Sequence, residues 1–261
     1  MASHYPMASW ATHRRLIYTL SIIGFLAAVL AYPLFSFLYE KPTCFDGKQN
    51  QGEAGIDCGG SCELLCAFEA VAPVILCSKS LEVEPGLYDA VAYVENPNVG
   101  AGVRSIPYSF KLYDDKGILV AERAGSTFIN PKERLTVFEG RIETGKRIPV
   151  RTFFEFIAAP AWEKTKGASP VLVIRNQVFT GDEEKPKLRA EIVNNLLDVV
   201  ENITVTALIF DRNDNIVAAS KTEVDRLIPE SSKTISFIWP QKLSDEAIRI
   251  EIVPRVNVVL E

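Results

Sequence analysis

The sequence predicts a mainly β protein with an N-terminal transmembrane helix, a small disulfide-rich module and two tandem antiparallel β-sandwiches. Three observations lead to this prediction: a long uncharged run near the N-terminus, five cysteines clustered within 34 residues behind it, and an alternating apolar pattern that occurs twice. The predicted parts are a cytoplasmic tail (1–15), the transmembrane helix (16–38), the cysteine-rich module (39–70), the first sandwich (71–164) and the second sandwich (165–261).

Residues 16–38 carry no charge. A helix rises about 1.5 Å per residue, so a run of this length crosses a hydrocarbon core of about 30 Å. One proline inside the run is tolerated in a membrane span. We expect 16–38 to stay in the lipid bilayer as a single-pass anchor. A cleaved secretory signal is the alternative, with Val29 and Ala31 at small-residue cleavage positions, although the apolar core of a signal usually has about 7–15 residues.

Charged flanks and cysteines together predict the orientation. Arg14 and Arg15 directly precede the run, whereas Lys41 and Lys48 follow it among acidic residues. Basic residues favour the cytoplasmic side of a span, so the adjacent arginine pair favours a cytoplasmic N-terminus. Clustered cysteines with glycine and polar neighbours are typical of a disulfide-stapled module in an oxidising compartment. We therefore expect a single-pass protein of the cell membrane, with residues 39–261 extracytoplasmic.

The composition excludes several classes of function. The formal net charge is −5, which argues against nucleic-acid binding because neutralising phosphates requires a basic face. His4 and His13 both precede the apolar run, so the predicted ectodomain contains no histidine. That removes Ser-His-Asp and Cys-His nucleophiles, histidine metal ligands and a histidine pH switch. We expect no enzymatic activity.

Residues 44–66 read CFDGKQNQGEAGIDCGGSCELLC. The pattern resembles a short cysteine-rich motif found just outside the membrane or between domains in prokaryotic surface proteins. Five cysteines leave at least one unpaired, and each choice of the odd one leaves three ways to pair the others. We expect Cys77 to be a free thiol buried in the core, because it ends the apolar run VAPVILC. The predicted disulfide-forming residues are Cys44, Cys58, Cys62 and Cys66.

Three interpretations of the module remain open. In the first, the disulfides hold tight turns that Asp and Asn side chains cap, and glycines at 47, 59 and 60 supply positive φ. In the second, a calcium ion is also bound, because carboxylate and amide oxygens lie close in sequence. Its candidate ligands are Asp46, Asn50, Glu53 and Asp57. The third is a zinc or iron–sulfur site on four thiolates, although a CxxC pair is missing.

An alternating apolar pattern occurs twice in the rest of the chain, at an offset of 97–98 residues. Residues 92–96 (AYVEN) correspond to 190–194 (AEIVN), and the alternating run 106–112 corresponds to 203–209. Each copy then reaches an aromatic–aspartate pair and a turn. A period of two predicts strands with one buried face and one wetter face. Strands at intervals of about 8–15 residues with turns between them predict antiparallel sandwiches, and the offset indicates a duplication.

Two short motifs in the first copy resemble known families. Residues 110–114 (FKLYD) are similar to the FxLYD family of small extracytoplasmic β domains. Residues 96–98 (NPN) resemble an element of late-embryogenesis-abundant, water-stress β-sandwich domains. The resemblance covers residues 87–140 and implies a seven-stranded, immunoglobulin- or fibronectin-like sandwich without enzymatic activity. It also implies that Phe110 and Tyr113 are packing residues.

The second copy departs from both motifs. Residues 207–211 (ALIFD) keep only the aromatic–aspartate end, and Asn194-Asn195 stands in place of NPN. Asp211 and the asparagines that follow it have alternate spacing, which we interpret as a hairpin turn. Residues 164–169 (KTKGAS) are the predicted linker, and its shortness predicts two sandwiches that touch or bend only modestly.

These features predict a non-catalytic, membrane-anchored structural or interaction protein of the cell envelope. Its expected partners are the bilayer around 16–38 and an envelope protein that the sequence does not identify. The alternative is a metal- or redox-responsive sensor with the module from Cys44 to Cys66 as its site.

Overall fold

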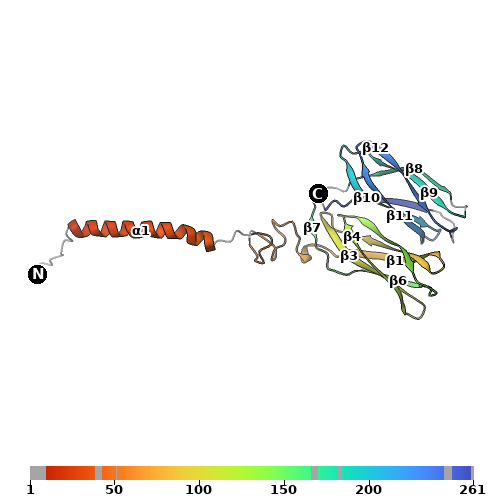
Figure 1. Ribbon diagram of the computed structural model, residues 1–261, viewed down its shortest axis with the longest axis horizontal. Helices are drawn as coiled ribbons and strands as arrows, with labels where there is room; N and C mark the ends of the chain where they lie inside the picture. The colour runs from red at the N-terminus through yellow and green to blue at the C-terminus, as the bar shows by residue number, and fades with distance from the viewer. Residues whose placement is uncertain are drawn as a thin grey trace.

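The computed structural model describes residues 10–38, 43–50, 52–165, 170–180, 184–243 and 249–259. Along the longest axis of the molecule, an N-terminal helix is followed by the small cysteine-rich module and then by two β-sandwiches side by side (Figure 1). The predicted mainly β fold class is confirmed.

The helix α1 (Trp10–Leu38) has 29 residues and is longer than the uncharged run. At about 1.5 Å per residue it extends about 44 Å, which exceeds the hydrocarbon core of a bilayer. Its apolar window, Thr12–Phe35, has no residue buried against the rest of the described chain. Near its start, the Arg14 guanidinium lies 4.3 Å from the centre of the Trp10 ring. The helix is thus long and apolar enough to cross a membrane, a property that a signal sequence shares.

The first sandwich consists of two antiparallel sheets. One has the order β1-β2-β5 and the other β4-β3-β6, with the two-residue β7 also pairing with β3. The resemblance implied seven strands, and this count is reached in the described residues only if β7 is included. The strands are β1 (Val74–Glu84), β2 (Leu87–Glu95), β3 (Ala101–Tyr113), β4 (Leu119–Ile129), β5 (Arg134–Glu143), β6 (Arg151–Phe156) and β7 (Glu163–Lys164).

The second sandwich has sheets of order β12-β9-β8 and β11-β10-β13, again antiparallel. In the described residues its six strands correspond in order to β1–β6 of the first sandwich. Residues 166–169 of the predicted linker lie outside the described residues. The strands are β8 (Val173–Thr180), β9 (Lys187–Asn194), β10 (Val200–Phe210), β11 (Ile216–Leu227), β12 (Ser231–Ile238) and β13 (Arg249–Arg255).

Each sandwich has its own core, built from the predicted inward faces. In β3, Ile106, Tyr108, Phe110 and Leu112 are all buried. Phe110 packs with its ring centre 5.0 Å from that of Phe154 on the neighbouring strand β6. In β10 the equivalent alternation also points inward, since its four apolar members are completely buried in the second core. The period-two interpretation of these strands is confirmed.

The predicted wetter face of β10 is wrong. Leu208 is 0% exposed, and Phe210 on the same outer face is also buried. The physical reason is that sheet β11-β10-β13 packs its outer face against sheet β1-β2-β5 of the first sandwich. This packing forms a third apolar cluster, which contains Leu208 and Phe210 together with Leu81 and Val91 of the first sandwich. The two sandwiches therefore share a buried interface.

Polar contacts reinforce this interface. Arg255, at the end of β13, forms an ion pair with Glu133 of the first sandwich at 2.7 Å, and its side chain is only 4% exposed. The chain beyond β13 then docks on Asn130, whose amide nitrogen donates to the Val256 carbonyl and whose oxygen accepts from the Val258 amide. Through these contacts, the C-terminal segment holds the second sandwich against the first.

Candidate functional site

The cysteine-rich module contains two disulfides, Cys44–Cys62 and Cys58–Cys66. All four predicted cysteines are therefore paired. Gly60 has a positive φ of 53°, and a Cβ there would lie 2.0 Å from the Gly52 carbonyl oxygen, so no other residue fits this turn without a backbone shift. Gly47 and Gly59 also have positive φ, as predicted.

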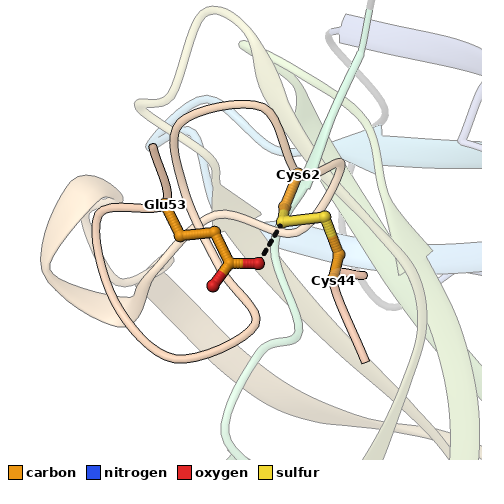
Figure 2. Close-up of side chains that lie close together, drawn as sticks. All are labelled: Cys44, Glu53 and Cys62. Atoms are coloured by element: carbon orange, nitrogen blue, oxygen red, sulfur yellow. Dashed lines mark hydrogen bonds between the residues drawn. A yellow bond between two sulfur atoms is a disulfide. The ribbon is translucent and has the colours of Figure 1, made fainter. Parts of the chain in front are cut away.

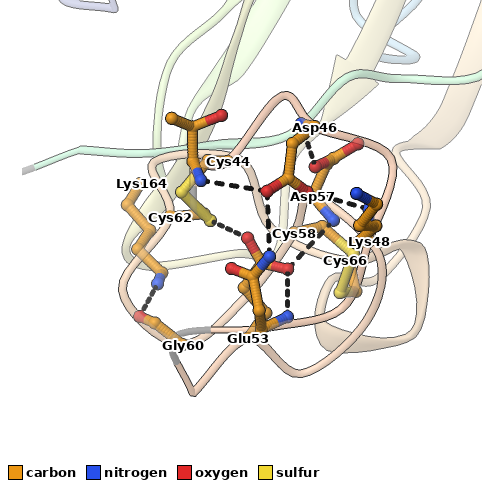
Figure 3. The surroundings of a disulfide bond; sticks show 12 residues. Cys44, Asp46, Lys48, Glu53, Asp57, Cys58, Gly60, Cys62, Cys66 and Lys164 are labelled. Atoms are coloured by element: carbon orange, nitrogen blue, oxygen red, sulfur yellow. Dashed lines mark hydrogen bonds between the residues drawn. A yellow bond between two sulfur atoms is a disulfide. The ribbon is translucent and has the colours of Figure 1, made fainter. Parts of the chain in front are cut away.

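Asp46 and Asp57 connect the two arms of the module. The Asp57 carboxylate accepts the backbone N–H groups of Asp46 and Gly47, each at 2.9 Å (Figure 3). Asp46 accepts the side-chain amide of Asn50 and the backbone N–H groups of Thr43 and Lys48. The Asn50 bond first, and then these backbone bonds, lower the pKa of Asp46.

Glu53 is buried within the module at 7% exposure. Its Oε2 accepts the backbone N–H groups of Asn50 and Asp57 at 3.2 and 3.3 Å. Its Oε1 lies 3.1 Å from the Cys62 sulfur (Figure 2). Because a disulfide sulfur carries no hydrogen, this approach is a packing contact and not a hydrogen bond. Glu53 thus holds two backbone amides and rests against the Cys44–Cys62 disulfide.

The four predicted calcium ligands are brought together in one loop, but most of their oxygens already accept N–H groups. Two oxygens are exceptions: Asn50 Oδ1 is buried without a hydrogen-bond partner in the described residues, and Glu53 Oε1 only contacts the Cys62 disulfide sulfur. Calcium needs six to eight oxygen ligands, so an ion here would have to replace the N–H donors on Asp46 and Asp57. The arrangement matches the turn-capping interpretation, and calcium binding stays a prediction.

A second donor group consists of Cys44, Glu53 and Cys62, whose sulfur and oxygen atoms lie within 4.8 Å of one another. Metal ions bind cysteine as the thiolate, whereas both sulfurs here are joined in a disulfide. This group could bind a metal only after reduction of the Cys44–Cys62 bond.

The module docks on the end of the first sandwich that carries β7. Leu64 forms a β-bridge with Glu163, and the Leu65 amide donates to the Trp162 carbonyl at 2.8 Å. The Lys164 ammonium donates to the Gly60 carbonyl at 2.6 Å (Figure 3). Leu65 also packs against the core of the first sandwich. Module and sandwich are therefore joined by both backbone pairing and apolar contact.

Cys77 is a free thiol, as predicted, but the expected burial in the core is wrong because its side chain is exposed. Cys77 lies on β1, an edge strand, opposite Tyr93 of β2. The preceding residues Val74, Ile75 and Leu76 are also exposed, so the apolar run begins outside the core. An apolar run marks a strand, but its position at the edge of a sheet is set by the tertiary structure.

Cys77 lines a groove of about 510 Å³ between the two sandwiches, which the sequence did not indicate. Its charged side chains are largely paired with one another. Arg249 forms ion pairs with Asp214 and Glu251 at 2.9 and 3.1 Å, and its guanidinium lies 3.6 Å from the centre of the Phe210 ring. Burial, followed by the Glu251 carboxylate, raises the pKa of Tyr93. The Arg249 contacts lie within the second sandwich, and the Tyr93 hydroxyl crosses the groove to Glu251 at 3.5 Å. These charged side chains therefore compensate one another rather than leave charges for a ligand.

The residues of the FKLYD motif and the corresponding Asp211 make packing and turn-capping contacts. The Asp114 carboxylate accepts the backbone N–H groups of Lys116 and Ile118, and Asp211 caps the corresponding turn of the second sandwich in the same way. Phe110 is completely buried, and Tyr113 packs edge-on against Phe153 with ring centres 5.5 Å apart. No family model matches the chain, and no curated protein matches it either.

Proposed function

We propose that this chain is a non-catalytic, single-pass membrane-anchored protein whose β-rich part lies outside the cytoplasm and acts as a structural or interaction element of the cell envelope. In this proposal α1 is an uncleaved anchor, and the N-terminus is cytoplasmic. The two disulfides support an oxidising compartment for the module.

The observation that carries the proposal is an unbroken series of contacts from the module to the second sandwich. The module pairs with β7, the two sandwiches share an apolar cluster, and the C-terminal segment returns to the first sandwich. Inter-domain motion is expected when an interface is small and polar, whereas a buried apolar interface opposes it. The described ectodomain is therefore suited to hold a binding surface at a fixed distance from an anchor.

We further infer that the two sandwiches are tandem copies of one unit. Asn96 and Asn194, which are 98 positions apart, are both buried and both donate side-chain N–H groups to backbone carbonyls. Asp114 and Asp211, which are 97 positions apart, cap equivalent turns. The same strand order in both sandwiches supports this inference, and with it the proposed kinship to FxLYD-like or late-embryogenesis-abundant-like domains.

The orientation is tested with the exposed Cys77 thiol as a native reporter. Intact cells are treated with a membrane-impermeant maleimide, and labelling of the full chain is measured before and after lysis. We expect labelling in intact cells, and none in Cys77→Ser, because the other four thiols are oxidised. Labelling that appears only after lysis would place the ectodomain in the cytoplasm and overturn the proposal.

The interaction role is tested in intact cells with a photo-cross-linking residue at exposed positions of the sandwiches, such as Val99, Leu197 and Ile228. A single envelope protein recovered reproducibly at neighbouring positions supports the proposal. Absence of protein adducts at every position, together with a defined turnover by the purified chain, contradicts it.

A redox- or metal-responsive sensor is the second candidate, favoured by the donor group of Cys44, Glu53 and Cys62. Elemental analysis and a free-thiol count on protein isolated without reductant separate the two candidates. One thiol per chain and no bound transition metal support the structural role. Three thiols with a stoichiometric metal support the sensor.

A further inference from the structure

Three large apolar side chains of the module point away from the described chain. Phe45, Ile56 and Phe68 are 82, 63 and 75% exposed. Among the described residues of the module, the buried ones are Glu53, Gly59, Cys62 and Cys66, which do not make up a large apolar core. Such exposure of aromatic and aliphatic groups in a small, disulfide-fixed unit indicates a surface that another apolar phase covers.

The contacts of the module bring the three side chains into one neighbourhood. The Asp46 amide, next to Phe45, donates to the Asp57 carboxylate, next to Ile56, at 2.9 Å. A Cβ on Gly55, which precedes Ile56, would lie 3.9 Å from the Phe68 ring. The disulfides hold this arrangement, because Cys44 directly precedes Phe45 and Cys66 lies two residues before Phe68. The three exposed side chains are therefore carried by one disulfide-fixed unit, and we refer to them together as its apolar surface.

The position of this surface in the chain identifies what covers it. Phe45 follows the last residue of α1, Leu38, by seven positions. A fully extended chain spans at most about 3.6 Å per residue, so Phe45 lies within about 25 Å of the end of the helix. The headgroup layers of a bilayer occupy the zone just beyond its hydrocarbon core of about 30 Å. After α1, the module is the first part of the chain that the structure describes (Figure 1), so it would lie next to a membrane that α1 spans.

The charges near this surface do not oppose contact with lipid. Asp46 and Asp57 accept several N–H groups each, and Glu53 is buried. Glu69, which is exposed beside Phe68, accepts the Cys66 backbone N–H at 2.9 Å, so each of these carboxylates has a hydrogen-bond donor within the module. Apolar insertion at the interface depends on buried area, and anionic lipid adds to it only where a basic face is present. A zwitterionic bilayer is therefore a sufficient partner.

We propose that the module rests on its own membrane, with Phe45, Ile56 and Phe68 inserted at the boundary between headgroups and acyl chains. This inference rests on the proposed function, because it requires α1 to be an anchor. Its consequence is a fixed tilt of the rigid ectodomain relative to the bilayer, since the module is docked on the first sandwich.

The test places a photo-cross-linking residue singly at positions 45, 56 and 68 of the full chain in phosphatidylcholine nanodiscs. The matched control is position 148, because Ile148 is 67% exposed and follows β5 at the end of the first sandwich remote from the module. We expect lipid adducts by mass spectrometry at the three module positions and only background at 148. One free thiol per chain verifies that the disulfides have formed in each variant.

A second variant tests cooperation among the three side chains. Phe45→Ser/Phe68→Ser is expected to cause loss of the lipid adduct at position 56, whereas Ile148→Ser leaves it unchanged. Adducts to a second protein chain, or no lipid adduct at any module position while the chain stays with the nanodisc, overturn this inference alone. A chain that separates from the nanodisc overturns the anchor of the proposed function as well.

Discussion

Asn96 and Asn194 are buried asparagines, each at the end of a strand. The side-chain amide of Asn96 donates to the carbonyls of Ala101 and Asn130, and that of Asn194 donates to the carbonyls of Asp198, Leu227 and Ile228. Each also accepts, through Oδ1, the backbone N–H two residues later. The sequence shows an NPN motif at Asn96, but the burial of this side chain and its carbonyl partners depend on strands that are distant in sequence.

Replacing Asn194 by alanine leaves buried carbonyls without a donor. We expect the free energy of unfolding of Asn194→Ala to fall by about 2 kcal/mol, since an unsatisfied buried polar group costs about 1–3 kcal/mol. Urea denaturation of the full chain in detergent measures this free energy of unfolding. Asn213→Ala, at an exposed turn position, serves as the control and should change stability by less than about 0.5 kcal/mol. Equal effects of the two substitutions would contradict this role.

Asp114 links stability to pH. Its pKa is lowered by the Ile118 backbone hydrogen bond, then by the Lys116 backbone hydrogen bond and by Arg147. A carboxylate whose pKa is lower in the folded state stabilises the fold above its unfolded pKa of about 3.9, and this stabilisation is lost as the pH falls through the folded pKa. We expect the urea midpoint of Asp114→Asn to fall less between pH 7 and acid pH than that of the wild type. Identical pH profiles would show that this carboxylate does not contribute.

At the scale of elements, the module shows how a short segment without an apolar core becomes ordered. Its two disulfides close loops with sequence separations of 18 and 8 residues, and carboxylates cap the turns between them. The sequence indicated which four cysteines pair, but not in which combination, because several pairings satisfy the spacing equally well. The contact between Glu53 and the Cys62 sulfur also had no sequence signal.

Removing the longer disulfide tests the dependence of the module on its covalent links. For Cys44→Ser/Cys62→Ser we expect the free energy of unfolding of the module to fall by roughly 3 kcal/mol. The reason is that the unfolded chain regains the entropy that the disulfide removes by closing a loop with a sequence separation of 18 residues. Limited proteolysis should then cut within 43–66 while both sandwiches stay intact. Cys77→Ser is the control, and its cleavage pattern should match the wild type because Cys77 is unpaired. Unchanged protection of the module in the double variant would contradict the prediction.

At the scale of the whole molecule, the packing of the two sandwiches decides the shape of the β-rich part of the chain. Leu208 is completely buried in this packing, in the cluster that contains Leu81 and Val91 of the first sandwich. The ion pair between Arg255 and Glu133 closes the same interface at one side. The predicted linker is short, but these direct contacts, rather than the linker, fix the two sandwiches together.

A charge at position 208 is expected to separate the sandwiches. Leu208→Asp buries an unpaired carboxylate in the interface. The free-energy cost of desolvating this charge exceeds the cost of a large-to-small core substitution, which is about 2–5 kcal/mol. Small-angle scattering should show a larger radius of gyration, while circular dichroism retains the strand signal of both sandwiches. Leu197→Asp, at an 84% exposed position, is the control. An unchanged radius for Leu208→Asp would show that other contacts hold the interface.

The sequence by itself determined the apolar helix, the four paired cysteines, the strands around Phe110 and Ile209, and the aspartate turns. These features depend on local periodicity, spacing and turn chemistry, which are properties of residues close together in the sequence. Only the tertiary structure decided the exposure of Cys77, the burial of Leu208 and the contacts of the C-terminal segment with the first sandwich. Those properties depend on which sheet edge meets solvent and which sheet faces meet each other. Such contacts join segments more than a hundred residues apart, and alternation along one strand cannot distinguish a face that meets water from one that meets a second sandwich.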